Sequence, residues 1–233
     1  MLDLERNTIY RLVRRSRLMR RIFRDIAFWL DMQSLAAYKP PEEIALIRTV
    51  KRESDTYLTA TEAYMVYTLA RAQAHLPGEM AEVGVYRGGS SKLICEVKGD
   101  VPLHLFDTFR GLPTPSPADR GFFQPGMFAS RLKEVQAYLS AYPQVHFHPG
   151  RFPETGAPVS ETRFSFVHLD VDVYDSMKAC LSFFSPRLAP GGVILLHDYQ
   201  YPGVRQAVEE IFPAQEASVI PLNTSQCLVR ALP

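Results

Sequence analysis

The sequence is poor in cysteine, carries almost no net charge and lacks a long apolar run, and each absence excludes a class of protein. Its three cysteines, Cys95, Cys180 and Cys227, stand far apart with no CxxC pair. This argues against a disulfide framework and a structural zinc site, and it suits a reducing environment. A formal net charge of +1 gives no general field that would attract nucleic acid. No apolar run is long enough to cross a bilayer, and the N-terminus lacks the apolar centre of a secretory signal. We therefore expect a cytoplasmic protein with no nucleic-acid partner.

The composition that remains is that of an ordinary globular protein. Of the 233 residues, 46% are hydrophobic and 22% are charged, and this length is sufficient for one sizeable core with an appended segment. There is no internal repeat and no low-complexity tract. We therefore expect one main domain.

One strongly basic segment lies near the N-terminus. From about Leu4 to Ala37, apolar residues recur at the three-and-four spacing of an amphipathic helix. Only Asp3, Glu5 and Asp25 offset the arginines of this segment, which are Arg6, Arg11, Arg14, Arg15, Arg17, Arg20, Arg21 and Arg24. Two interpretations stay open: the helix packs against its own domain or a second copy of the chain, or it binds an anionic membrane or an acidic partner.

After the basic segment, the sequence pattern changes from helical to an alternation of β-rich and helical stretches. Pro40 and Pro41 interrupt the first helix, and a second is predicted over about 59–75, capped by Thr59 or Thr61. From there on, short β-rich runs alternate with helical stretches, which predicts a doubly wound, mostly parallel α/β sheet whose ligands bind beyond the carboxyl ends of its strands. These runs are Met80–Val85, Leu103–Phe106, Val145–His148, Phe164–Asp170 and Val193–His197. A proline-rich segment from Pro113 to Pro125 reads as a surface loop, either a lid or a passive connection.

A glycine-rich turn, AEVGVYRGGSS, follows the first of these strands. Glycines allow a ligand close to the backbone, and the helix that follows offers free N–H groups to an anion. That anion is either the pyrophosphate of a nucleotide or the carboxylate of S-adenosylmethionine. The spacing E-x-G-x-x-x-G-G departs from the G-x-G-x-x-G fingerprint, which makes a nicotinamide cofactor the poorer interpretation. A purely structural turn remains open.

Acidic residues follow three later strands. Asp107 ends the second strand a little over 20 residues after the glycines, where an acid accepts hydrogen bonds from ribose hydroxyls; its alternative role is to cap a helix. Asp170 and Asp172 follow one long apolar run, and His197 and Asp198 follow the next. Because neighbouring parallel strands end at one edge, these groups should converge. Such crowding is unfavourable unless a cation or a substrate proton offsets it, which favours chemistry over capping.

Five ordered motifs resemble the macrocin-type O-methyltransferases, a family that includes sugar O-methyltransferases of macrolide and aminocoumarin antibiotic pathways. The motifs are AEVGVYRGGSS, LFDTFRGLP, GRFPET, LDVDVYDS and PGGVILLHDYQYPGVRQAVEEIF. The resemblance covers about Tyr57 to Phe212. It implies the class I methyltransferase fold, with a Rossmann-like, seven-stranded sheet, and S-adenosylmethionine as cofactor.

The resemblance also assigns cofactor contacts. The methionine end would lie against the glycine turn, the ribose near Asp107 and the adenine near the segment that begins at Gly150. The residues concerned are Glu82, Gly84, Tyr86, Gly88, Ser90, Asp107, Thr108, Phe109, Gly150, Arg151 and Phe152.

A divalent metal, Mg²⁺ in the family, would be bound by the positions matching Asp170, His197 and Asp198, and Asp172 is a candidate general base. The sequence departs from the family here, because His197 stands where an aspartate is usual. Three outcomes stay open: Mg²⁺ bound by Asp170 and Asp198 with water completing the shell, a softer metal recruited by His197, or no metal with His197 as base. The expected catalytic residues are Asp170, Asp172 and His197.

These observations combine into one expectation with two rivals. Residues 1–40 form a basic amphipathic extension, 41–78 a helical lid segment and 79–233 the S-adenosylmethionine-binding domain. Residues 47–67 and the proline-rich loop would close over a small-molecule hydroxyl acceptor, with Tyr57 and Tyr64 offering aromatic faces. The expected function is O-methylation of a sugar moiety by a homo-oligomer. A nicotinamide-dependent reductase, or a non-catalytic, membrane-associated protein that retains the fold, are the alternatives.

Overall fold

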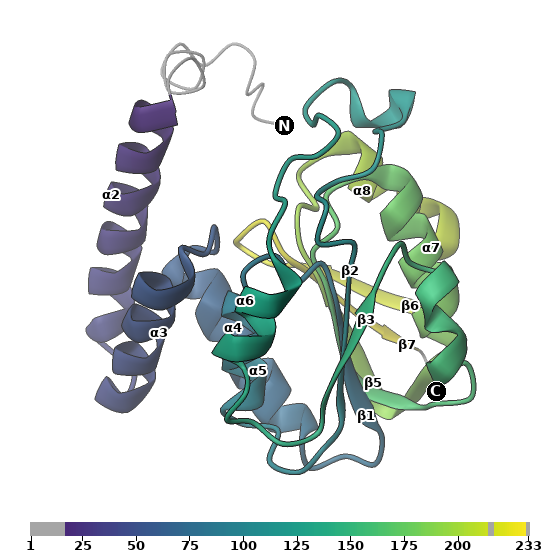
Figure 1. The fold of residues 1–233 in the computed structure, drawn as a ribbon, viewed down its shortest axis with the longest axis horizontal. Helices are drawn as coiled ribbons and strands as arrows, with labels where there is room; N and C mark the ends of the chain where they lie inside the picture. Colours follow the sequence, from purple (N-terminus) through teal and green to yellow (C-terminus); the bar gives the residue numbers. More distant parts are fainter. Residues whose placement is uncertain (1–16, 214–216, 232–233) are drawn as a thin grey trace.

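A seven-stranded, mostly parallel sheet forms the centre of the molecule (Figure 1). The computed structural model describes residues 17–213 and 217–231. The strand order is β3-β2-β1-β4-β5-β7-β6; β1 to β5 are parallel, and β7 runs antiparallel to both β5 and β6. The strands are β1 (Glu79–Val83), β2 (Leu103–Asp107), β3 (Val145–Pro149), β4 (Phe164–Leu169), β5 (Leu188–Leu196), β6 (Ala217–Pro221) and β7 (Cys227–Ala231). The predicted fold class is confirmed. The five predicted strands match β1 to β5 within a few residues.

Helices cover both faces of the sheet. In Figure 1, α3 to α6 lie on one side and α7 and α8 on the other. The helices are α2 (Arg17–Ala36), α3 (Pro41–Ser54), α4 (Ala60–Gln73), α5 (Gly89–Cys95), α6 (Leu132–Tyr138), α7 (Tyr174–Phe184) and α8 (Pro202–Ile211). Three short 3₁₀ turns, η1 (Pro117–Asp119), η2 (Glu154–Val159) and η3 (Ser185–Arg187), interrupt the connections.

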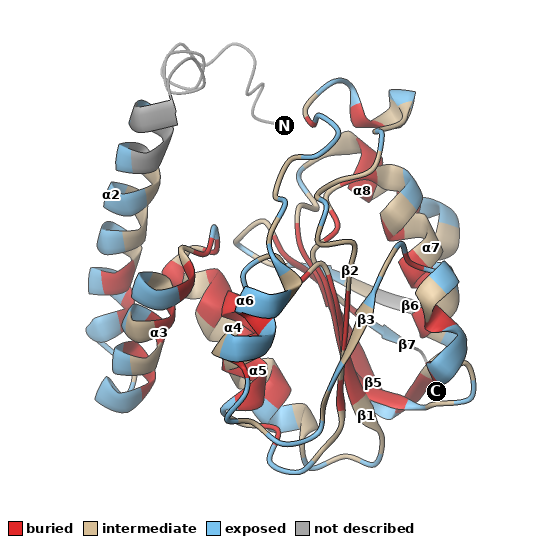
Figure 2. Cartoon of the chain, in the orientation of Figure 1, coloured by how far each residue is buried: buried red, intermediate tan, exposed pale blue. Residues whose placement is uncertain are grey.

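The central strands are apolar because both of their faces are covered. Every residue of β4 is buried, as expected for a parallel strand between two helical layers. Along β1, alternate side chains enter opposite cores: Met80 packs with α3, α4 and α5, whereas Ala81 and Val83 pack with α7 and α8. Figure 2 shows the central strands of the sheet as the most buried part of the chain. This arrangement fixes the carboxyl ends of β1, β2, β4 and β5 at one edge.

The N-terminal segment is helical where it is described. Residues 17–36 form α2, while the rest of the predicted basic helix lies outside the described residues. Met32 and Leu35 are buried against α3 and α4. The opposite side of α2 leaves large apolar side chains exposed, namely Met19, Ile22, Ile26, Trp29 and Leu30. Among the described residues, no helix combines the length and apolar character that a membrane span requires.

The segment between α2 and β1 is a fixed part of the core. Pro41 begins α3, an ordinary place for proline because the first helical N–H has no partner. The predicted helix that follows is confirmed as α4, and Thr59 caps it in a capping box with Glu62. Ile47 and Val66 are buried with the sheet residues. Most of residues 47–67 therefore pack with the core, and their closure over a substrate stays a prediction.

Candidate functional site

One cavity of about 420 Å³ opens at the carboxyl ends of the five parallel strands, β1 to β5. This is the edge at which doubly wound sheets bind their ligands. The predicted site residues that line it are Gly84, Tyr86, Ser90, Asp107, Thr108, Gly150, Arg151, Phe152, Asp170, Asp172, His197 and Asp198. The glycine turn and the acidic residues therefore share one cavity.

The glycine turn passes very close to the strand beside it. Gly84 has a φ of 89°, and a Cβ atom at this position would overlap the carbonyl oxygen of Asp170. No side chain fits in this gap. The next residues turn sharply, with Tyr86 also in the left-handed region at a φ of 51°, before α5 begins after Gly88. The turn thus presents bare backbone to the cavity.

Asp107 ties the end of β2 to this turn. One carboxylate oxygen accepts hydrogen bonds from the N–H groups of Val85 and Tyr86, both at 2.8 Å, and the other accepts from the N–H of Phe109 at 2.6 Å. Burial raises the pKa of Asp107, and these three N–H donors oppose the rise. A carboxylate oxygen can accept more than one hydrogen bond, so Asp107 keeps capacity for a ligand hydroxyl.

Three residues expected at the cofactor lie outside the cavity lining. Glu82 is fully buried within β1, where its carboxylate accepts from His168 Nδ1 at 2.8 Å and from the hydroxyl of Ser91. Gly88 faces α6, since a Cβ there would meet Val135 and Tyr138. Phe109 packs against the core. The motif places these residues correctly in the sequence, but strand alternation and helix packing turn them away from the cavity.

Asp170, Asp172 and Asp198, here called the acid triad, lie together on the opposite side of the cavity. One oxygen from each carboxylate lies within 4.8 Å of the others. Burial and the neighbouring charges raise the pKa of Asp170 and that of Asp198 to about 6, and that of Asp172 still further. Asp172 and Asp198 also hold left-handed backbone conformations, which cost energy in any residue but glycine. Three half-buried carboxylates in this arrangement fit a hard cation, which would offset their repulsion.

His197 lies outside this group. The structure brings together Asp170, Asp172 and Asp198, whereas the expected ligand set had His197 in the place of Asp172. The His197 ring is 4% exposed, and its Nε2 atom lies 2.8 Å from Nε2 of Gln226. Burial lowers the pKa of His197 to about 4, so the ring is neutral. A metal at His197, or a role for it as base, therefore stays a prediction.

Sequence reasoning missed Glu62, Ser225 and Gln226. Glu62 lines the cavity, and its carboxylate accepts from the N–H of Thr59 and from the N–H and hydroxyl of Ser225. The capping-box spacing from Thr59 to Glu62 was the one signal in the sequence, and it predicts a helix start only. The contacts to Ser225 and Gln226 join residues more than 160 positions apart, which no local pattern reveals.

The loop after β2 forms a wall of the cavity. Backbone hydrogen bonds between Leu112 and Met127, at 2.8 Å, and between Gly126 and Leu112, at 2.9 Å, close the base of the loop. Asp119 is buried, and its carboxylate accepts from the N–H of Tyr174 at the start of α7. Pro113 and Phe123 line the cavity. The interpretation of the proline-rich segment as a binding element is therefore favoured over a passive connection.

Aromatic side chains form the rim on the side of α2. The rings of Tyr57, Tyr86 and Phe128 lie 5.3–6.2 Å apart, and all three residues line the cavity. The guanidinium of Arg24 lies 4.6 Å from the centre of the Tyr57 ring. Tyr64, the other aromatic residue expected here, packs against the core instead.

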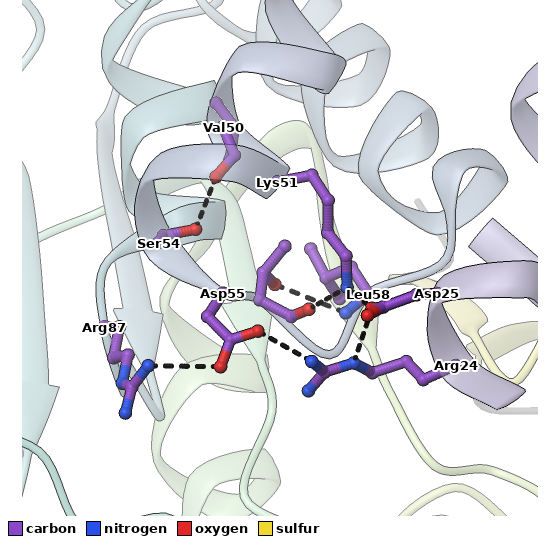
Figure 3. A network of polar contacts seen from close by, with 9 residues as sticks. Arg24, Asp25, Val50, Lys51, Ser54, Asp55, Leu58 and Arg87 are labelled. Carbon is purple, nitrogen blue, oxygen red and sulfur yellow. Dashed lines mark hydrogen bonds and ion pairs between the residues drawn. The ribbon is translucent and has the colours of Figure 1, made fainter. Parts of the chain in front are cut away.

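An ion-pair network supports this rim (Figure 3). The carboxylate of Asp55, at the end of α3, forms ion pairs with the guanidinium groups of Arg24 in α2, at 2.6 Å, and of Arg87 in the glycine turn, at 3.2 Å. Lys51 donates to the carbonyl of Thr56 at 2.8 Å. The N-terminal helix is thereby connected to the glycine turn through a single carboxylate.

Two curated relatives are similar in sequence. The 8-demethyl-8-(2,3-dimethoxy-alpha-L-rhamnosyl)-tetracenomycin-C 4'-O-methyltransferase of Streptomyces olivaceus is 33% identical over 153 residues, which are 58% of this chain and 58% of that protein. The mycinamicin III 3''-O-methyltransferase of Micromonospora griseorubida is 31% identical over 153 residues, 58% of this chain and 60% of that protein. The matches thus span about three fifths of the length of these relatives.

A solved structure and a family match give the broader relationship. The O-methyltransferase NovP superposes with a TM-score of 0.67 at 20% identity, covering 76% of this chain and 82% of that chain, which shows a common fold. Residues 65–224 match the macrocin-O-methyltransferase (TylF) family. This match covers more than half of the chain and confirms the resemblance seen in the motifs. The chain therefore belongs to the macrocin-O-methyltransferase family.

Proposed function

We propose that this chain transfers a methyl group from S-adenosylmethionine to a hydroxyl of a small molecule, a sugar moiety of a natural product or glycan. The observation that carries the proposal is a single cavity with the glycine turn and Asp107 on one side and the acid triad on the other. The relative from Streptomyces olivaceus is named for a rhamnosyl-bearing acceptor, which supports the choice of a sugar moiety.

The glycine turn and the end of β2 would hold the cofactor. Gly84, Ser90 and Asp107 line the cavity where bare backbone and a carboxylate face a ligand. When bound, S-adenosylmethionine supplies the methyl group that the acceptor oxygen attacks. The protein's contribution is orientation, because in-line displacement depends on the alignment of the reacting atoms.

The acid triad would bind a divalent cation and receive the acceptor's proton. Carboxylate oxygens are the ligands that Mg²⁺ prefers, so we assign Mg²⁺ to Asp170 and Asp198. A cation there would favour the deprotonated acceptor oxygen. Asp172 is our candidate for the general base. Burial and the charges of Asp198 and Asp170 raise its pKa, which favours uptake of a proton.

Two substitutions distinguish the role of the cofactor side of the cavity from that of the acceptor side. Asp107→Ala should weaken S-adenosylmethionine binding by about tenfold or more, the equivalent of about 1.4 kcal/mol. Asp170→Ala should keep that affinity within about threefold but abolish methyl transfer, because its role concerns the acceptor. Calorimetry with S-adenosylhomocysteine and methyl-transfer assays with a panel of sugar acceptors, with and without Mg²⁺, measure both. Unchanged cofactor affinity in Asp107→Ala, or lost affinity in Asp170→Ala, contradicts the assignment.

We also propose that the exposed apolar side of α2 packs against a second copy of the chain in the cytoplasm. Met19, Ile22, Ile26 and Trp29 recur along one side, and a twofold axis makes such a stripe complementary to itself. Arg24 is turned away from this side toward Asp55, so its charge need not enter the contact.

Light scattering on the full chain tests this contact. A double substitution, Ile26→Asp with Trp29→Asp, should convert a dimer to a monomer, whereas Ser34→Asp, which is exposed on the same helix, should leave the mass unchanged. A monomeric unaltered chain contradicts the proposal. If that monomer also floats with anionic liposomes, the exposed apolar side of α2 binds a membrane surface.

A further inference from the structure

Three buried or nearly buried residues from distant elements meet behind the acid triad. His197 follows β5, Gln226 precedes β7 and is 1% exposed, and Glu62 lies in the first turn of α4. We call this unit the His197 clamp. His197 lines the cavity and directly precedes Asp198 of the acid triad, so the chemistry of this unit bears on the site.

The orientation of the Gln226 amide follows from its neighbours. One end of the amide lies 3.2 Å from the backbone carbonyl oxygen of Glu62. A carbonyl oxygen only accepts hydrogen bonds, so this end must be the NH₂ group. The other end, the amide oxygen, accepts from the hydroxyl of Thr224 at 3.3 Å. Both contacts agree on one orientation.

This orientation determines the state of His197. The Gln226 NH₂ group lies 2.8 Å from His197 Nε2. Since an amide nitrogen only donates, His197 Nε2 must accept, and a neutral ring then carries its proton on Nδ1. A proton on Nε2 would point at the amide hydrogens. Rotating the amide to avoid them would set its oxygen against the carbonyl oxygen of Glu62.

A ring held in this way has no free lone pair. Nε2 is occupied by Gln226 and Nδ1 is protonated, so neither nitrogen can bind a metal or take up a proton. The acid triad, by contrast, is assembled without His197. The one group that His197 can offer is an N–H donor.

We propose that Gln226 holds His197 as the neutral tautomer protonated at Nδ1, and that this N–H positions an oxygen acceptor in the cavity, so that His197 acts neither as metal ligand nor as general base. Glu62 anchors the clamp through its backbone carbonyl and through its carboxylate contact with Ser225. The identity of the oxygen acceptor rests on the proposed function, whereas the tautomer of His197 does not.

Long-range ¹H–¹⁵N spectra of the full chain with ¹⁵N-labelled histidine test the tautomer directly. The His197 signal, assigned by its absence in His197→Asn, should show a protonated Nδ1 and an unprotonated Nε2. Gln226→Leu should shift it toward a mixture of tautomers, whereas Gln206→Leu, the same change on the exposed side of α8, should leave it unaltered. A protonated Nε2 in the unaltered chain overturns the proposal. The measurement needs no substrate, so it decides the matter even if the chain transfers no methyl group.

A pair of substitutions of similar shape tests the role of the N–H. Asn at this position offers an N–H close to that of Nδ1, whereas Asp offers only acceptor oxygens. His197→Asn should therefore keep kcat/KM within about tenfold and Mg²⁺ affinity within about threefold, while His197→Asp should lower kcat/KM by more than about tenfold. If His197→Asn loses Mg²⁺ binding measured by calorimetry, or His197→Asp is the more active variant, His197 is a ligand or a base and the proposal fails.

Discussion

At the scale of single residues, Gly84 joins the two sides of the cavity. Its backbone lies against the carbonyl group of Asp170, so the glycine turn and the acid triad are held at a fixed separation. The sequence predicts a glycine turn here, because the motif follows a strand. It cannot predict this contact, which depends on how β1 and β4 pair.

Substitution of two glycines separates steric overlap from backbone strain. Gly84→Ala should destabilise the fold by more than about 4 kcal/mol, because its methyl group overlaps a neighbouring strand. Gly121 also has a positive φ, of 74°, but a methyl group there would meet no other atom within 4 Å; Gly121→Ala should cost only roughly 1–2 kcal/mol of strain. Urea unfolding measures both. Equal losses in the two variants would show that the close contact is unimportant.

Residues of the site differ in how far the sequence reveals them. Asp107, Asp170 and Asp198 were predictable, because each follows a β-rich run and parallel strands end at one edge. The orientation of the Glu82 side chain was not predictable, since the motif gives its place in the chain but not the face of the sheet on which its side chain lies. Gln226 could not be predicted at all, because its partners come from α4 and β5.

At the scale of elements, Lys98 connects the turn after helix α5 to the turn before β3. This lysine is 2% exposed, and its ammonium group donates to the carbonyls of Gly99, Val101 and Pro143. These carbonyls belong to the turns after α5 and before β3, and a buried carbonyl without a donor is costly, so the ammonium group stabilises both turns. Burial lowers the pKa of Lys98, a cost that the hydrogen bonds offset.

Lys98→Met should destabilise the chain by at least about 2 kcal/mol, since buried carbonyls would lose their donor. Thermal and urea unfolding measure the loss, and Lys133→Met, at an exposed position of α6, is the control. A stability loss no larger than that of the control would mean that water replaces the ammonium group without cost.

The edge of the sheet carries a histidine pair that should respond to acid. His148 on β3 lies 3.0 Å from His104 on β2, which in turn lies 2.6 Å from Glu79. Burial, with the charges of His104 and His146, lowers the pKa of His148 from 6.5 to about 4. The unfolded chain therefore binds more protons below pH 6.5, so this group's contribution to stability is present above that pH and is lost as the pH falls toward 4.

His148→Gln, which keeps a donor toward His104, should make the fall in stability between pH 6.5 and 4 shallower. Unfolding midpoints across this range test the expectation, with His75→Gln, at an exposed position, as the control. A variant with the same pH profile as the unaltered chain would exclude His148 as a source of acid sensitivity.

Elements were predictable where their hydrophobic pattern decided their burial. Strands β1 to β5 stand out because each is apolar and bounded by helical stretches. Strands β6 and β7 do not, since they lie after the last helix and pair antiparallel at an edge. Helix α3 lies in the segment predicted as helical, 41–78, but its bounds were not predicted, since a proline that ends one helix can also begin the next.

At the scale of the whole molecule, the cavity is built from both ends of the chain. Its walls include the α3–α4 connection, the turns after the five parallel strands, and Ser225 before β7. Alternation of strands and helices predicts the sheet and therefore the edge at which this cavity opens. The enclosure of that edge by the N-terminal helices and by the loop after β2 depends on long-range contacts, and only the structure reveals it.

Because so many elements contribute to one cavity, a bound ligand should stabilise the entire fold. S-adenosylhomocysteine at a hundredfold excess over its Kd should add about 2.7 kcal/mol to the free energy of unfolding. For a chain of this size, that corresponds to a rise in Tm of roughly 5–10 °C. NAD should cause no rise, because the glycine turn lacks the dinucleotide spacing and its bare backbone lies beside Asp170. Differential scanning calorimetry of dialysed protein compares the two ligands. Stabilisation by NAD and not by S-adenosylhomocysteine would assign the turn to a dinucleotide and remove the basis for methyl transfer.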